Sequence, residues 1–128
     1  MTYHFTKMLD TDMDTAIAKA TEALAAEGFG VLTEIDVAAT LKKKIDVDFR
    51  PYRILGACNP HFAHKALQAE DKIGTMLPCN VIVQQVGDGK VEVSAVDPMA
   101  SMAAIENPAL EGIATEVRAK LKSVIDRL

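Results

Sequence analysis

The side chains best suited to chemistry gather in one stretch of this chain, residues 50–83. It holds both cysteines, Cys58 and Cys79, and two of the three histidines, His61 and His64. A cysteine thiolate is a nucleophile and a ligand for soft metal ions. If the two cysteines lie side by side, they could form a reversible disulfide, hold a metal ion or carry a sulfur species. The alternative is that both are small buried hydrophobic residues, as free cysteines often are.

Cys58 comes directly before an expected helix, because Asn59 is a good N-cap and Pro60 a good first helical residue. Free N–H groups and the helix dipole favour a thiolate at such a place. Cys58 is therefore the candidate nucleophile, and Cys79 the second catalytic candidate. The Cys-Asn pair recurs at Cys79 and Asn80, so the predicted ligand-binding residues are Cys58, Asn59, Cys79 and Asn80. In the alternative interpretation both asparagines are structural, one as a helix cap and one bonded to a neighbouring loop.

A metal site is the next hypothesis for this stretch. His61 and His64 are three residues apart on the first turns of the helix that follows Cys58. With Cys58 and Cys79 they would form a Cys/His set for a soft metal ion, zinc or copper. Their spacing matches no zinc-finger pattern. A solvated helix face is the simpler interpretation of the two histidines.

The totals set the class of the protein. A chain of 128 residues, 49% apolar and 25% charged, is typical of one soluble domain spanning residues 1–128. A net charge of −4 argues against nucleic acid as a partner. No apolar run approaches the ~20 residues of a membrane span, and no secretory signal opens the chain. We therefore expect a cytoplasmic protein, in which two cysteines serve as thiols, ligands or redox groups rather than as a structural disulfide.

The elements that position the site follow from hydrophobic periodicity and from turn residues. The predicted order is β-α-β-(α)-β-α-β-β-α. The third strand spans 52–58, its helix 60–69, and the fourth strand begins at Met76 or Leu77. In a parallel arrangement the two cysteines would lie at opposite ends of a strand, roughly 17–20 Å apart. In an antiparallel meander they would lie at the same end and could converge.

Several motifs, in order, resemble the bacterial and archaeal family known as domain of unknown function 302. They lie at residues 28–36, 49–60, 73–74, 77–81 and 97–98. The resemblance implies a small α+β fold, with a curved, mainly antiparallel five-stranded sheet and helices packed on it, in the TATA-binding-protein-like class. It therefore favours the antiparallel arrangement and neighbouring cysteines. It implies no activity, and a shared fold does not carry DNA binding with it.

Three functions remain open at this point. The first is a small ligand-binding or thiol-redox module, with an anionic or thiol ligand at Cys58 and Cys79. The second is a homodimeric structural or interaction protein with inert cysteines. The third is a thiol-dependent enzyme with Cys58 as nucleophile. The chain contains no glycine-rich phosphate loop, no HExxH and no CxxC motif that would point to another chemistry.

Overall fold

A computed structural model describes residues 2–128 of the protein. The strands are β1 (His4–Leu9), β2 (Gly30–Asp36), β3 (Tyr52–Cys58), β4 (Cys79–Gly87) and β5 (Lys90–Val96). The helices are α1 (Met13–Ala26), α2 (Val37–Ile45), α3 (Pro60–Ala69), α4 (Pro98–Ser101) and α5 (Pro108–Asp126), with a 3-10 helix, η1 (Asp71–Met76). No helix in this part of the chain is both long and apolar enough to cross a membrane.

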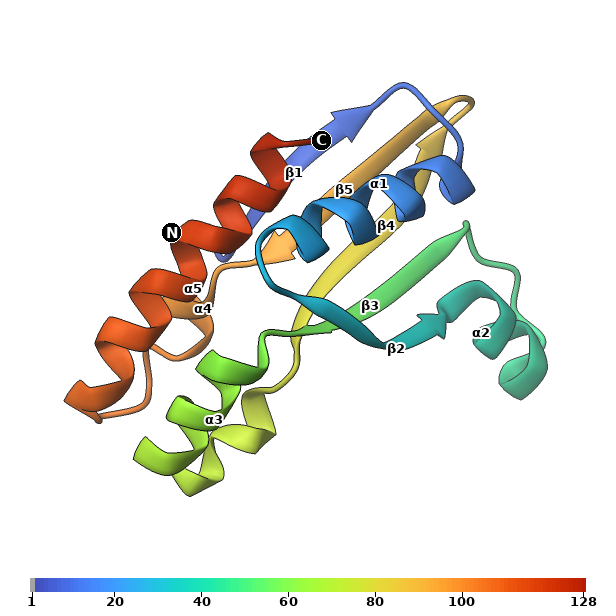
Figure 1. The fold of residues 1–128 in the computed structure, drawn as a ribbon. Coiled ribbons are helices and arrows are strands. Elements are labelled where there is room, and N and C mark those ends of the chain that lie inside the picture. The colour runs from blue at the N-terminus through green and yellow to red at the C-terminus, as the bar shows by residue number, and fades with distance from the viewer. Residues whose placement is uncertain (1) are drawn as a thin grey trace.

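All five strands form one sheet in the order β1-β5-β4-β3-β2, and every neighbouring pair is antiparallel. Strands β2 to β5 are an antiparallel meander, which confirms the predicted fold class. Helix α1 carries the chain from one edge strand, β1, to the other, β2 (Figure 1). The two edges are therefore formed by the first two strands, and the chemistry-bearing strands β3 and β4 lie inside the sheet.

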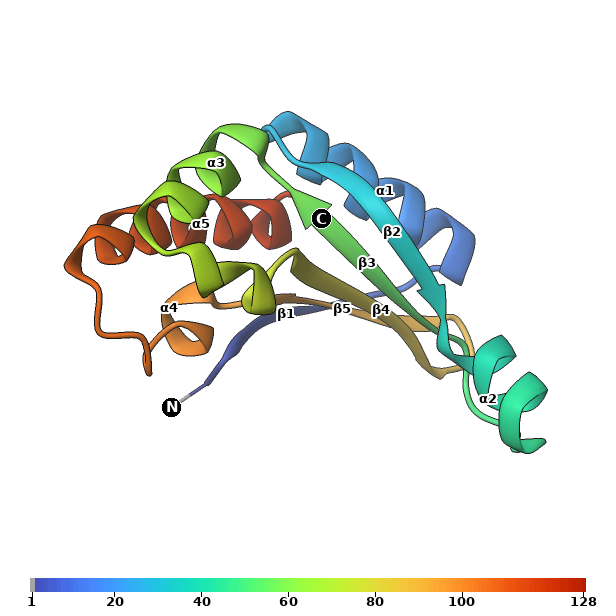
Figure 2. The same cartoon turned by 90° about the horizontal axis from the view of Figure 1, so that it is seen from below.

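The core lies between the sheet and a layer of helices. Figure 2 shows α1, α3 and α5 on one side of the sheet, while α2 stands beyond its far end. Val91, Val93 and Ala95 are fully buried on β5, as strict alternation requires. Leu24 of α1 and Leu121 of α5 are buried against them in the same cluster. Burying each of these valine and leucine side chains stabilises the fold by about 1.5–3 kcal/mol.

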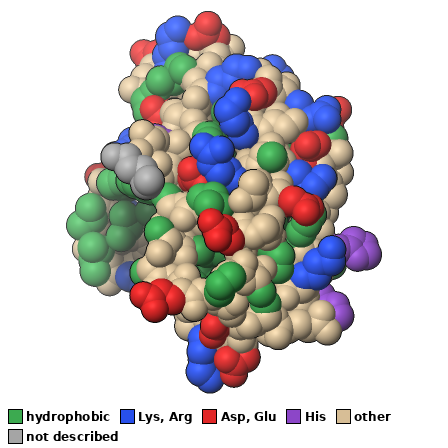
Figure 3. Space-filling model, turned by 90° about the vertical axis from the view of Figure 1, so that its left-hand side faces the viewer, with side chains coloured by type: hydrophobic (Ala, Val, Ile, Leu, Met, Phe, Trp, Pro, Cys, Tyr) green, Lys and Arg blue, Asp and Glu red, His purple; other side chains and the backbone are tan. Residues whose placement is uncertain are grey.

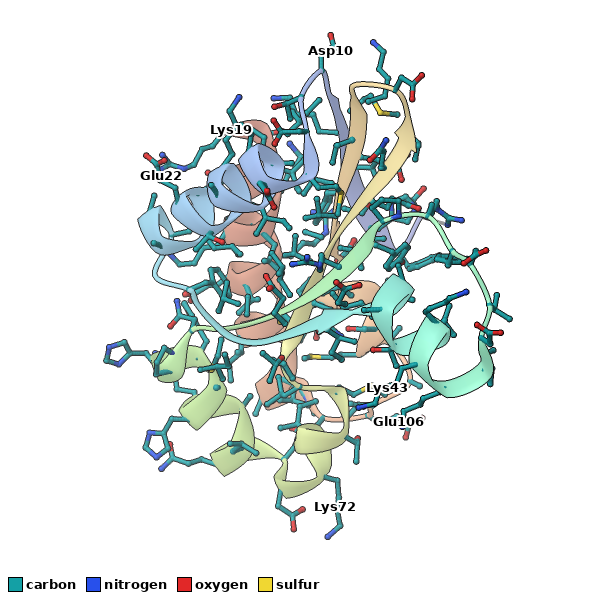
Figure 4. The ribbon with its side chains drawn as sticks, turned by 90° about the vertical axis from the view of Figure 1, so that its right-hand side faces the viewer. Asp10, Lys19, Glu22, Lys43, Lys72 and Glu106 are labelled. Atoms are coloured by element: carbon teal, nitrogen blue, oxygen red, sulfur yellow. The ribbon has the colours of Figure 1, made fainter. Side chains whose placement is uncertain are left out.

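The outer faces of the helices are charged. The labelled side chains of Lys19 and Glu22 point from α1 away from the sheet (Figure 4), and both are exposed. Acidic and basic side chains are also mixed over the face of the molecule in Figure 3. A mixed surface of this kind is what an amphipathic helix presents to solvent when its apolar stripe faces the core.

The strand that carries Cys79 begins later than predicted. We expected β4 to start at Met76 or Leu77, but residues Asp71–Met76 form η1 and the strand starts at Cys79. Ile73 is fully buried and fixes η1 to a second apolar cluster with Ala66 of α3. Pro78 has no N–H group to donate to the ladder, so regular pairing starts only after it.

Candidate functional site

The two cysteines lie at the same end of the sheet. Cys58 is the last residue of β3, and Cys79 is the first residue of β4. The register pairs Ala57 with Cys79, so Cys58 lies one residue further along the neighbouring strand. Both are free thiols, with no disulfide between them. The antiparallel order therefore brings together two residues that a parallel order would have separated.

Both cysteines line one cavity of about 310 Å³. It lies between the end of the sheet, α3 and α5, and no charged side chain lines it. Its volume is at the lower end of the ~300–1,000 Å³ range of small-molecule sites. The apolar residues that line it are Phe29, Leu32, Ala57, Phe62, Ala63, Ala66, Leu67, Leu77, Pro78, Pro98, Met102, Ile113, Ala114 and Val117. Apart from the two thiols, Asn59 supplies the cavity's polar side chain.

Cys79 is chemically quiet. Its side chain belongs to the main core cluster and is buried. Burial raises the pKa of the Cys79 thiol to about 11, and the nearby Cys58 adds a smaller shift in the same direction. Removing a charge from water disfavours the ionised form, and a second thiolate nearby disfavours it further. At neutral pH Cys79 is therefore a protonated thiol, a poor nucleophile and a poor metal ligand.

Cys58 is the more accessible of the two thiols. It is only partly buried, and it lies immediately before the N-cap of α3. Of the two predicted catalytic candidates, it is therefore the one that solvent and a reagent can reach. Its place in the cavity wall beside Cys79 also means that any molecule in the cavity lies next to both sulfur atoms.

Asn59 holds the predicted N-cap position of α3 but does not make the predicted bond. Its side chain forms no capping hydrogen bond, and it has no hydrogen-bond partner among residues 2–128. It is nevertheless only 8% exposed. Its amide nitrogen lies 3.0 Å from the point at which a Cβ on Gly28 would stand. The side chain thus lies against Gly28, before β2, and makes no hydrogen bond to the first turn of α3.

The amide atoms of Asn59 are reachable despite this burial. No side-chain nitrogen or oxygen in the described residues is both fully buried and unpartnered. Because the Asn59 amide has no partner, its atoms must therefore border open space. Asn59 is also a lining residue of the cavity, so its amide lies at the border of that space.

Three other predicted site residues lie elsewhere. Asn80 is exposed between the buried residues Cys79 and Val81, so strand alternation places it on the opposite face of the sheet. His61 and His64 are exposed on α3, and histidine side chains protrude at the margin of Figure 3. Within the described part of the chain, no three His, Cys, Asp or Glu side chains are grouped to hold a metal ion. The structure does not bring these three residues to the thiols.

A second, wider hollow lies on the other side of Met102 and Ala114, which line both spaces. It measures about 1000 Å³ and contains the buried carboxylate of Asp97. That carboxylate accepts hydrogen bonds from the Met99 N–H at 3.0 Å and from Arg118 Nε at 3.1 Å. The buried acid is therefore fully engaged in structure, and the cavity at the cysteines is the better candidate site.

Sequence reasoning missed most of the cavity wall. Ile113, Ala114 and Val117 of α5 line it, although they are far from the cysteines in sequence. The apolar stripe of α5 is typical of a helix face that packs on a core, but nothing in it marks the part that extends past the core. The sequence feature that could have indicated the cavity is a pair of alanines, Ala63 and Ala114, on facing helices. Their small side chains leave a space that larger side chains would fill.

Comparison with known proteins agrees with the family resemblance that the sequence motifs indicated. The family model described as domain of unknown function DUF302 matches residues 5–128. The crystal structure of an uncharacterized conserved DUF302 protein from Bacillus stearothermophilus superimposes with a TM-score of 0.90 at 33% sequence identity. That match covers 99% of this chain and 98% of the other. No curated protein matches. The chain therefore belongs to the DUF302 family.

Proposed function

We propose that this protein is a binding module for a small, mainly apolar molecule, held in the cavity beside Cys58 and Cys79. One observation carries the proposal: the cavity joins two thiols and one amide to walls that are otherwise apolar. Small-molecule sites typically have such walls, with a few polar groups that fix orientation. The two free thiols also support a reducing compartment, the cytoplasm, as its location.

Binding is favoured over thiol catalysis and over a redox or metal role. Thiol catalysis, thiol redox chemistry and metal binding each need a thiolate. A metal site made of both cysteines needs two thiolates. The pKa of Cys79, about 11, keeps that residue protonated at neutral pH. A thiol-dependent enzyme would have to rely on Cys58 alone. In the described residues no histidine lies among the residues that line the cavity, so none is placed to act as its base.

The direct test is an amide NMR titration with toluene as an apolar probe. We expect shifts to concentrate on residues of the cavity wall, such as Ala57, Ala66 and Val117. The variant Ala63→Leu places a larger side chain on a cavity-lining position of α3. It should abolish these shifts. The matched control is Ala119→Leu, the same change at an exposed position of α5, and it should leave them intact.

Two results would overturn the binding proposal. One is a titration in which toluene produces no localised shifts in the folded wild-type protein. The other is an Ala63→Leu variant that folds normally and still shows the wild-type pattern. In that case the shifts arise from a surface site and not from the cavity.

A homodimer is the second candidate, and exposed apolar side chains favour it. Helix α2 has no buried residue. Ile35, Ile45, Val47 and Phe49 are exposed at the same end of the molecule, beside the free edge of β2. An unpaired edge strand next to apolar side chains is a template for pairing with a second copy of itself. We propose that β2 and α2 form this contact.

Light scattering tests the dimer. The wild type should have twice the mass of one chain, and Phe49→Asp should reduce it to one. Met76→Asp is the control, because Met76 is similarly exposed but precedes the start of β4. Residue 49 instead lies near the end of β4, where the Gln85 N–H bonds to the Pro51 carbonyl at 3.0 Å. A wild-type protein with the mass of a single chain would contradict the homodimer proposal.

A further inference from the structure

The chain contains two Asn-Pro helix starts, and they use their asparagines differently. At the start of α5, Asn107 Oδ1 accepts from the Ala109 N–H at 3.1 Å, and Asn107 Nδ2 donates to the Ala69 carbonyl at 2.8 Å. Asn59 at the start of α3 makes neither kind of bond, although it is more deeply buried. Buried amides are normally satisfied. An unsatisfied amide in a cavity wall therefore indicates a partner that the protein itself does not provide.

The first turn of α3, which follows Asn59 directly, has further free donors. Pro60 has no N–H, and the Ala63 N–H is the first to bond back, to the Asn59 carbonyl at 2.9 Å. The N–H groups of His61 and Phe62 lie between them and have no acceptor in the described part of the chain. These N–H groups point out of the N-terminal end of a helix, where its dipole is positive. Together with the Asn59 amide they form a set of hydrogen-bond donors suited to an anion.

The charges around the cavity have the same sign. The ammonium groups of Lys65 and Lys120 lie 5.7 Å and 5.9 Å from the ring centre of Phe62, a residue of the cavity wall. Neither lysine forms a salt bridge with an acidic side chain of residues 2–128. No aspartate or glutamate lines the cavity. The local potential therefore attracts an anion, and nothing in the wall repels it.

We propose that the ligand is a small amphiphilic monocarboxylate, which gives the proposed binding function a substrate class and rests on it. The carboxylate binds at the Asn59 end, where it accepts from the Asn59 amide and from the free N–H groups of α3. The hydrocarbon part occupies the apolar cavity, beside the protonated thiol of Cys79. Lys65 and Lys120 attract the anion and contribute charge at the Phe62 wall. Binding is reversible, and no bond is made or broken.

The experiment compares three probes with the same six-carbon chain, hexanoate, 1-hexanol and hexylamine, by calorimetry and amide NMR at pH 7. Hexanoate should bind at least about tenfold more tightly than 1-hexanol, a difference in free energy of about 1.4 kcal/mol. Hexylammonium should bind most weakly. The preference for hexanoate should shrink at high salt, because screening weakens attraction between exposed charges.

Two sets of variants locate the anion. Asn59→Leu removes the amide at nearly constant size and should lower the affinity for hexanoate without lowering that for 1-hexanol. The double variant Lys65→Met, Lys120→Met should also reduce the preference for hexanoate. Its changes are at surface charges, so it remains informative if Asn59→Leu fails to fold. Lys19→Met is the matched control, because Lys19 projects from α1 into solvent and does not line the cavity (Figure 4).

The outcomes separate this inference from the function on which it rests. If hexanoate and 1-hexanol bind equally well in the cavity, or if folded Asn59→Leu and the double variant keep the wild-type preference, the carboxylate class is wrong and the apolar site stands. If toluene produces no localised shifts in the folded wild-type protein, the proposed function itself is wrong, and the carboxylate class falls with it. If hexanoate shifts only exposed residues outside the cavity while toluene shifts the cavity wall, the carboxylate class is wrong and the apolar site stands.

Discussion

At the scale of single residues, burial decides which of two similar side chains is reactive. Cys58 and Cys79 occur in similar Cys-Asn motifs and line one cavity. Cys79 is nevertheless buried in the core, with its pKa raised to about 11, while Cys58 remains partly accessible. The same holds for the asparagines, since Asn59 is buried at the cavity and Asn80 is exposed on the other face.

The first prediction concerns thiol modification at pH 8. A Cys58→Ser variant, which retains only Cys79, should react with a disulfide reagent roughly 100-fold more slowly when folded than in denaturant, because raising the pKa of Cys79 from 9.0 to about 11 leaves roughly 100-fold less thiolate. Burial should slow the reaction of Cys79 further. When folded, it should also react more slowly than Cys79→Ser, whose remaining thiol, Cys58, is only partly buried. Stopped-flow absorbance gives both rates. In denaturant the two variants should react equally, and equal rates in the folded state would contradict the assignment of Cys79 as the quiet thiol.

At the scale of elements, the helix starts differ in what their caps contribute. Asn107 caps α5 through a side-chain bond, whereas Asn59 begins α3 without one. The strands also differ in how closely their neighbours approach. Gly56 on β3 lies close to Thr33 of β2 and to Pro78 before β4, so this position near the cavity end of the sheet has no room for a side chain.

The two asparagine caps should therefore respond unequally to the same substitution. Asn107→Ala should lower the free energy of unfolding by about 1–2 kcal/mol, because it removes a cap and a second hydrogen bond. Asn59→Ala should cost less than about 0.5 kcal/mol, since it breaks no hydrogen bond within the protein. Urea unfolding at pH 7 measures both. A larger loss for Asn59→Ala would show that its amide stabilises α3 after all.

Two glycines provide a second comparison within the elements. A Cβ at Gly56 would clash with Thr33 Oγ1 and lie 2.8 Å from Pro78 Cγ. Gly56→Ala should therefore destabilise the protein by about 1–3 kcal/mol through overpacking. Gly112 lies inside α5 with no atom within 4 Å of an added Cβ. Gly112→Ala should stabilise it by up to about 1 kcal/mol, because alanine favours the helix.

Thermal unfolding of the two glycine variants gives the measurement. The midpoint should fall for Gly56→Ala and rise for Gly112→Ala. A rise of both midpoints would mean that backbone entropy, and not the close approach of Thr33 and Pro78, controls the effect at Gly56.

At the scale of the whole molecule, one helical layer covers one face of one sheet, and the cavity lies where that layer passes beyond the strands. Helices α3 and α5 meet there over the ends of β3 and β4, and small side chains such as Ala63 and Ala114 leave space between them. The site is thus produced by the packing of the entire layer. The protonation of a residue in its wall, such as Cys79, should therefore be coupled to the stability of the fold.

Alkaline pH tests this coupling, because the pKa of Cys79 is higher in the folded protein than in the unfolded chain. The raised value means that folding retains a proton, so stability is complete below pH 9 and is lost as pH rises towards 11. Cys79 should account for a loss of about 2 kcal/mol between pH 8.5 and 10.5, at 1.36 kcal/mol per pKa unit. Urea unfolding at both pH values measures it.

A pair of core variants isolates the contribution of Cys79 from the other groups that titrate at high pH. Cys79→Ala should flatten the fall in stability. Val81→Ala removes a fully buried neighbour on the same strand, so it should lower stability but keep the wild-type dependence on pH. If Cys79→Ala retains the full wild-type dependence, Cys79 is not the group that titrates.

The sequence by itself determined the elements, because their signals are local. The alternation of Val91, Val93 and Ala95 is typical of a strand with one face on the core, and these residues are buried on β5. The Cys58–Asn59–Pro60 run correctly marked the end of β3 and the start of α3. The antiparallel order was chosen through the family motifs, since hydrophobic periodicity is the same in both topologies.

Only the tertiary structure decided what these residues can do. The capping bond expected of Asn59 is absent because its amide packs beside Gly28, a residue from another part of the chain. The pKa of Cys79 is high because α1, α5 and the neighbouring strands exclude water from it. The cavity exists because distant alanines face one another. Burial and hydrogen bonding depend on which segments contact one another in the fold, and local sequence patterns do not specify those contacts.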